Sequence, residues 1–170
     1  LHDVVDVDHR PGAVDSTCRP NQILAVGGLP RPLLEGPRAR AVVDRVERAL
    51  WTPLGLRSLA PAEPGYMGRY EGPPDVRDGA YHQGTVWAWL IGPYISAFAK
   101  AYGGEKDTIK YIKRLLLTFH EHVFEAGLGT ISEIFDGDSP HIPRGCISQA
   151  WSVGEILRAY FEHVHGLGDG

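Results

Sequence analysis

The sequence predicts an all-α fold, and three observations support this prediction. Apolar residues recur at helical spacing in three long segments, residues 37–50, 107–123 and 149–164. A fourth segment, residues 85–102, is apolar around almost its whole circumference, as expected of a helix buried on every side. No segment shows the sustained alternation of a strand. Alternation of buried with amphipathic helices is typical of two concentric helical layers, whose loops gather at one end and can form a pocket there.

The N-terminal third should contain two helices. Residues 1–20 place valines among aspartates without a clear period, and we expect them to be extended or irregular. A short helix is expected over residues 21–26, because two glycines and a proline follow it. The helix over residues 37–50 begins with proline, which suits a first helical position. Its apolar stripe consists of Ala39, Val42, Val43, Val46 and Leu50.

A long loop and three further helices are expected in the rest of the chain. Residues 52–80 are rich in Gly and Pro and lack a period, so we expect a long surface loop of the kind that is often functional. Pro93 should free a carbonyl in the helix over residues 85–102 and bend it. The helix over residues 107–123 should be amphipathic and lie on the outside. The helix over residues 149–164, with Ser148 as its N-terminal cap, has apolar residues at helical spacing: Val153, Ile156, Leu157, Tyr160, Phe161 and Val164.

Composition narrows the class of protein. A chain of 170 residues with 43% hydrophobic and 22% charged residues is typical of one globular domain. The net charge of −4 and the lack of a basic run argue against a nucleic-acid partner. Two cysteines, Cys18 and Cys146, exclude a disulfide framework, so we expect a reducing, cytoplasmic setting.

Two further features concern the membrane and the chain start. The apolar segment over residues 85–102 is interrupted by Gly, Pro and Lys, which favours a buried helix over a membrane span. The chain begins at Leu1 without an initiator Met or a signal-peptide pattern, so we expect it to be part of something longer.

The loop over residues 131–146 holds the first candidate site. Glu133 lies among apolar neighbours, which should raise the pKa of its carboxyl group. Carboxylates placed across a sugar are the working parts of glycoside hydrolysis. The alternative is that Asp136 and Asp138 form a turn and Glu133 is a solvated loop acid.

A metal site is a further alternative in this loop. Asp136, Asp138 and His141 could supply oxygen and nitrogen ligands, although their spacing matches no complete EF-hand. His120 and His122 resemble the HExxH motif only superficially, because Phe124 stands where the second His belongs, and we expect a solvated helix end. We therefore expect no metal and no cofactor.

A second cluster, residues 77–94, combines aromatic rings with hydrogen-bonding groups. Its members are Asp78, Tyr81, His82, Gln83, Trp87 and Trp89. Sugars stack on aromatic faces while amides and carboxylates bind their hydroxyls. A core of aromatics with a polar cap is the alternative. Arg19, Asn21 and Gln22, taken alone, indicate only a loop before a short helix.

Three motifs together carry a family resemblance. The segments RPNQILAVGGLP (19–30), YHQGTVWAWLIGPY (81–94) and ISEIFDGDSPHIPRGCISQAWSVGEILRA (131–159) resemble the C-terminal catalytic region of glycogen debranching enzymes, the amylo-α-1,6-glucosidase domain of bacterial and archaeal type. Their order and spacing agree with that region over almost the whole chain. Ala88 and Ser148 are small departures at positions that carry no chemistry.

The resemblance implies a fold and a reaction. It implies an (α/α)6 toroid, of which this chain, residues 1–170, is the later part, and hydrolysis of α-1,6 branch points of glycogen or a branched α-glucan with inversion. Glu133 occupies the position of the family's general base. The residues implied to bind substrate are Tyr81, His82, Gln83, Trp87, Arg19, Asn21, Gln149 and Trp151.

One departure limits what this chain can do alone. The family's general acid is an aspartate in a T-W-M-D type sequence, which is absent here. The isolated chain is therefore expected to be inactive, to need the earlier part of the domain as its partner, and to form homodimers through the faces left uncovered. The alternative function is a non-catalytic glucan-binding or helical interaction module.

Overall fold

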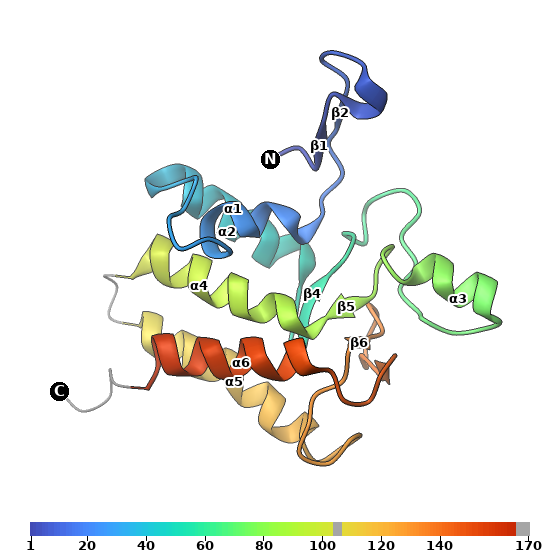
Figure 1. Ribbon diagram of the computed structural model, residues 1–170, viewed down its shortest axis with the longest axis vertical. Helices are drawn as coiled ribbons and strands as arrows, with labels where there is room; N and C mark the ends of the chain where they lie inside the picture. Colours follow the sequence, from blue (N-terminus) through green and yellow to red (C-terminus); the bar gives the residue numbers. More distant parts are fainter. Residues whose placement is uncertain (104–106, 166–170) are drawn as a thin grey trace.

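Helices dominate the computed structural model, which describes residues 1–103 and 107–165 (Figure 1). The helices are α1 (Leu24–Gly27), α2 (Gly36–Leu50), α3 (Pro74–Ala80), α4 (Ile91–Tyr102), α5 (Thr108–His122) and α6 (Ala150–His163). A small sheet lies at one end of the long helices. The predicted helix-rich fold is confirmed, whereas the prediction of an all-α chain without strands is wrong.

α4 is the central helix of the core. Its N-terminal half is buried from Ile91 to Ala97, and α1, α2, α5 and α6 all pack against it. Gly27 allows the close approach of α1, because a Cβ atom there would overlap the carbonyl oxygen of Pro93 and lie 2.6 Å from the amide nitrogen of Ala97. Pro93 lies in the first turn of α4, where an N–H group has no intrahelical partner. The expected disruption at Pro93 therefore does not arise.

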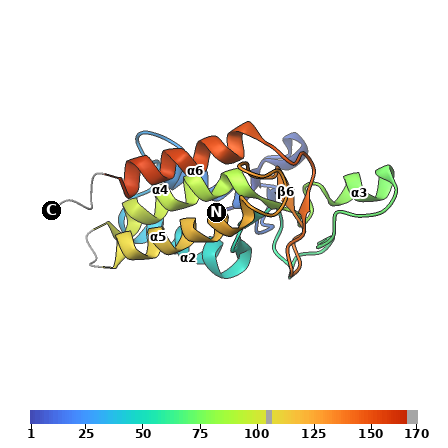
Figure 2. The ribbon, with the colours of Figure 1, turned by 90° about the horizontal axis from the view of Figure 1, so that it is seen from below.

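α2 and α5 are amphipathic, as predicted. α2 buries the whole predicted stripe from Ala39 to Leu50. α5 buries Ile112, Leu115 and Phe119 and exposes Lys110, Lys113 and Arg114. α6 packs along α4, and Figure 2 shows α2, α4, α5 and α6 running side by side.

The sheet is antiparallel and is built from very short strands. They are β3 (Trp51–Thr52), β4 (Gly55–Arg57), β5 (Val86–Trp87), β6 (Ile134–Phe135) and β7 (Pro143–Arg144), paired in that order. Strands of two or three residues cannot show a period of two, so no pattern revealed them. Residues 86–87 belong to this sheet, and the buried helix therefore begins later than predicted.

Two segments project from the body. Strands β1 (Val4–Val5) and β2 (Val14–Asp15) form an N-terminal hairpin that stands apart in Figure 1. The predicted loop over residues 52–80 is correct for its Gly- and Pro-rich middle, but the segment also contains β4 and ends in α3. α3 projects beside the sheet (Figure 2).

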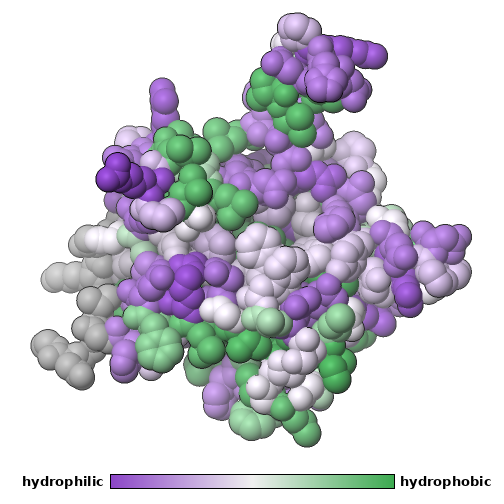
Figure 3. All heavy atoms as spheres, viewed as in Figure 1, coloured by the Kyte–Doolittle hydropathy of each residue, from purple (hydrophilic) through white to green (hydrophobic). Residues whose placement is uncertain are grey.

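One side of α6 carries exposed apolar side chains. Trp151, Leu157, Tyr160 and Phe161 are each between 41% and 57% exposed. Figure 3 shows hydrophobic side chains gathered along the lower edge of the molecule, over α5 and α6. Within the described residues, no helix has both the length and the apolar character needed to cross a bilayer.

Candidate active site

The sheet brings Glu133 next to the aromatic cluster. Trp87 of β5 pairs with Ile134 of β6, so the residue before Ile134 lies at the end of β5 where α4 is about to begin. The backbone N–H of Glu133 donates to the carbonyl of Cys146 at 2.9 Å, just beyond the paired residues of β6 and β7 and one residue out of their register. The segment that ends in β5 and the segment that begins β6 therefore meet beside the carboxylate of Glu133.

Both carboxylate oxygens of Glu133 have protein donors. The hydroxyl of Tyr81 donates to Oε1, and the backbone N–H of Cys146 donates to Oε2 at 2.9 Å. The side chain is only 9% exposed. Gly145 makes this arrangement possible, because its φ of +66° is left-handed and a Cβ atom there would overlap Oε2.

Two opposing effects set the pKa of Glu133. Burial raises it, but the hydrogen bonds from Tyr81 and from Cys146 lower it by more, and the pKa lies below its ordinary value of 4.5. The expectation of a raised pKa is therefore wrong. Apolar neighbours in the sequence could not reveal two donors that come from elsewhere in the fold.

Tyr81, which donates to this carboxylate, belongs to a cluster of aromatic rings. The ring of Tyr81 lies edge-on to His82 at 4.9 Å and to Trp87 at 4.8 Å between centroids. His82 and Trp87 are stacked in parallel, 5.3 Å apart. Trp151, from the start of α6, lies 6.0 Å from Trp87 and stacks on Trp89 at 5.7 Å.

These rings line a cavity of about 300 Å³. Its walls come from Arg19, Pro20, Asn21, Ser58, His82, Trp87, Trp89, Leu90 and Trp151. Five predicted substrate-binding residues are therefore together, whereas Glu133, Gln83, Tyr81 and Gln149 are not in this lining. Glu133 is connected to the wall through Tyr81, whose ring contacts both Trp87 and His82.

Several predicted sugar ligands already have protein partners. The guanidinium of Arg19 donates to the carbonyl of His82 at 2.7 Å and to the side-chain oxygen of Gln83 at 2.7 Å. Asn21 donates to Asp3 at 3.0 Å. Gln149, and not Ser148 as predicted, caps α6 by accepting from the N–H of Ala150 at 3.1 Å. Arg19 and Gln83 thus hold the turn that carries His82.

The neighbouring aspartates support the loop. Asp136 is fully buried, and its carboxylate accepts from the N–H of Tyr70 at 2.8 Å and from Arg144 at 3.0 Å. Asp138 accepts from the hydroxyl of Tyr66 at 2.9 Å. Asp136 is thus a buried ion-pair partner and not a solvated turn residue.

The metal alternative has no support in this geometry. The Nδ1 atom of His141 lies 2.9 Å from the backbone carbonyl of Asp136, and the carboxylates of Asp136 and Asp138 have the partners given above. Over residues 1–103 and 107–165, no group of three His, Cys, Asp or Glu side chains could hold a metal ion.

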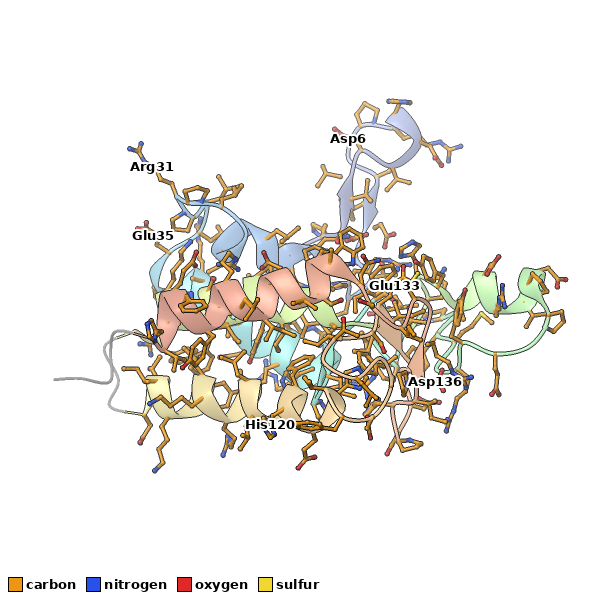
Figure 4. The ribbon with its side chains drawn as sticks, turned by 60° about the horizontal axis from the view of Figure 1, so that its bottom comes forward. Asp6, Arg31, Glu35, His120, Glu133 and Asp136 are labelled. Atoms are coloured by element: carbon orange, nitrogen blue, oxygen red, sulfur yellow. The ribbon has the colours of Figure 1, made fainter. Side chains whose placement is uncertain are left out.

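The prediction that α5 ends in solvated histidines is correct for His120 and wrong for His122. His120 is exposed, but His122 is 1% exposed, and its Nε2 accepts from the backbone N–H of Ser132 at 3.2 Å. His122 therefore fixes the residue that precedes Glu133. Figure 4 shows Glu133 near the strands at the start of α6, with His120 on α5 and Asp6 on the distant hairpin.

Sequence reasoning missed three contributors to the site. Gly145 and Cys146 act through the backbone, and Ser58 comes from the region predicted to be loop. A glycine just before Cys146 was a usable signal, because a loop glycine often marks a close approach or a left-handed residue. A donating backbone N–H leaves no trace in the sequence.

Comparisons with known proteins agree with the resemblance seen in the sequence. Residues 1–158 match the family model described as amylo-alpha-1,6-glucosidase. Among curated proteins, the chain is similar to the glycogen debranching enzyme of Saccharomyces cerevisiae, with 25% identity over 167 residues. The match covers 87% of this chain and 11% of that protein, so the chain spans about one ninth of the length of this relative.

Proposed function

The chain belongs to the amylo-α-1,6-glucosidase family, and on this premise we propose that it supplies the general base and part of the sugar site of a glycoside hydrolase that cleaves α-1,6 branch points of glycogen. The observation that carries the proposal is the carboxylate of Glu133, held by two donors beside stacked aromatic rings.

A general base must be ionised and correctly aimed. The pKa of Glu133 lies below 4.5, so its carboxylate is charged at neutral pH. In inverting hydrolysis, the base takes one proton from a water molecule while the water oxygen bonds to the anomeric carbon. A general acid gives one proton to the departing glycosidic oxygen on the other side of the sugar.

The acid must come from outside this chain. No T-W-M-D sequence occurs here, so we place the acid in an earlier segment of the same domain. An inverting pair needs carboxyl groups about 6.5–9.5 Å apart, with a water between them. The two segments would complete an (α/α)6 toroid, and the exposed apolar side of α6 is a suitable surface for that contact.

The aromatic cavity suits a sugar. The exposed ring of His82 is stacked on the buried Trp87, and Trp151 adds a half-exposed ring inclined by 73° to Trp87. Pyranose C–H groups pack on such faces, while Arg19 and Asn21 add polar groups to the same wall. We propose that this cavity holds glucose units of the glucan.

The test is the Glu133→Gln variant of the full-length protein. Glucose release from a branched limit dextrin should fall about 10²–10⁴-fold, while Glu121→Gln, an exposed change on α5, should leave it unaltered. NMR of the first product should show the β-anomer, as inversion requires. Release by Glu133→Gln within a few-fold of the parent would remove Glu133 from the base role.

A second candidate function follows from the missing aspartate. The 170-residue chain alone could bind glucan through the aromatic cavity without hydrolysing it. Binding of limit dextrin that disappears in Trp87→Ala, in a full-length protein that releases no glucose, would favour this binding module over the enzyme.

A further inference from the structure

We propose that Tyr81 is a positioning residue for Glu133 and not a sugar-binding residue. Its hydroxyl donates to Oε1, and together with the Cys146 N–H on Oε2 it fixes the orientation of the carboxylate. This inference rests on the proposed role of Glu133 as the general base. It replaces the expectation that Tyr81 binds substrate.

Both the backbone and the ring of Tyr81 are fixed by neighbours. The backbone carbonyl of Tyr81 accepts from the hydroxyl of Thr85 and from the indole N–H of Trp87, the latter at 3.2 Å. Its ring contacts Tyr70 at 5.7 Å, in addition to the edge-on contacts with His82 and Trp87. A donor fixed in this way needs no reorganisation when the reaction begins.

The hydrogen-bond count leaves room for the reacting water. An ionised carboxylate offers about four acceptor sites on its two oxygens. Tyr81 and the Cys146 N–H occupy one site on each oxygen of Glu133. These two donors leave up to two acceptor sites, which an incoming water molecule would share with the side chains of Cys146 and Gln149, since both also lower the pKa of Glu133 as hydrogen-bond partners.

The hydrogen bond from Tyr81 also favours the ionised form of Glu133. The hydroxyl of Tyr81 is the largest of the hydrogen-bonding influences that lower the pKa of Glu133 against burial. Burial and the same bond raise the pKa of Tyr81 itself, so the phenol stays protonated and remains a donor. Removal of the hydroxyl alone should raise the pKa of Glu133 and release one of its two anchors.

The experiment is Tyr81→Phe in the full-length protein, assayed on branched limit dextrin from acid to neutral pH. Because the phenyl ring keeps the contacts with Trp87 and His82, KM should change little, while kcat falls about 10-fold. The acid limb of kcat/KM should move up by about one pH unit, since one unit corresponds to a hydrogen bond of ordinary strength. Tyr66→Phe, which loses a hydroxyl bonded to Asp138, should show neither change.

Two further variants separate the possible failures. If Glu133→Gln is inactive but Tyr81→Phe matches Tyr66→Phe in kcat and in the acid limb, the role of Tyr81 is wrong and the base assignment stands. If Glu133→Gln stays active, the base assignment fails and the inference fails with it. If Tyr81→Phe does not fold, 3-fluorotyrosine at position 81 decides. Its more acidic hydroxyl should move the acid limb down, and an unmoved limb would overturn the inference.

Discussion

Gly145→Ala should misplace the base without changing any charged group. The φ of Gly145 is +66°, and a methyl group there would lie 3.2 Å from the carboxyl carbon of Glu133, 3.0 Å from Cγ1 of Ile134, and in overlap with Oε2. Carbon and oxygen normally lie about 3.5 Å apart, so the carboxylate must shift by roughly 1 Å. A displacement of that size at a reacting group costs on the order of 10²-fold in rate.

The assay must separate this displacement from backbone strain. Alanine at a left-handed position costs about 1–2 kcal/mol wherever it occurs. Gly12 has a φ of +79° in the distant hairpin, and a methyl group there would have no neighbour within 4 Å, so Gly12→Ala introduces the backbone strain without a steric clash. Gly145→Ala should lose at least as much stability as Gly12→Ala, because it adds the overlap with Glu133 to the same backbone strain, and only Gly145→Ala should lose kcat in the full-length protein. Equal kcat values for the two would refute the reasoning.

Three further outcomes can be measured by urea unfolding of this chain. Arg144→Met leaves the buried carboxylate of Asp136 without its closest cation and should lower the free energy of unfolding by about 3 kcal/mol, with partial recovery on adding Asp136→Asn. His122→Ala removes the acceptor of a buried N–H and should cost about 2–3 kcal/mol, against less than about 0.5 kcal/mol for the exposed His120→Ala. The pKa of Glu133 is lower in the folded chain, so its ionised form stabilises the fold above pH 4.5. The stability difference from Glu133→Gln should therefore be present at pH 7 and shrink as the pH falls below 4.5.

Long elements were predictable because each carries its own pattern. The stripe from Ala39 to Leu50 repeats at helical spacing over four turns, and it is buried as predicted. The apolar run within residues 85–102 correctly indicated a buried helix for the first half of α4, whereas the second half is only partly buried and the first residues of the run became β5. Val86 and Trp87 suit either state, and their partners in β4 and β6 decided between them.

The candidate site was predictable in its members and not in its contacts. The motifs carried His82, Trp87, Trp151, Arg19 and Asn21, which line one cavity. The direction of the pKa shift of Glu133 was not predictable, because its hydrogen-bond donors lie 52 and 13 residues away along the chain.

The sequence by itself determined the long helices α2, α4 and α5 and the buried stripe of α2, and it named Glu133 as the candidate carboxylate, because helical periodicity and a family motif are local properties of the chain. Only the tertiary structure decided how that carboxylate is held. The pairing of β5, β6 and β7 brings the hydroxyl of Tyr81 and the N–H of Cys146 to the two oxygens of Glu133. Hydrogen bonds of this kind require atoms to meet within about 3 Å, and distances between remote segments are set by folding alone.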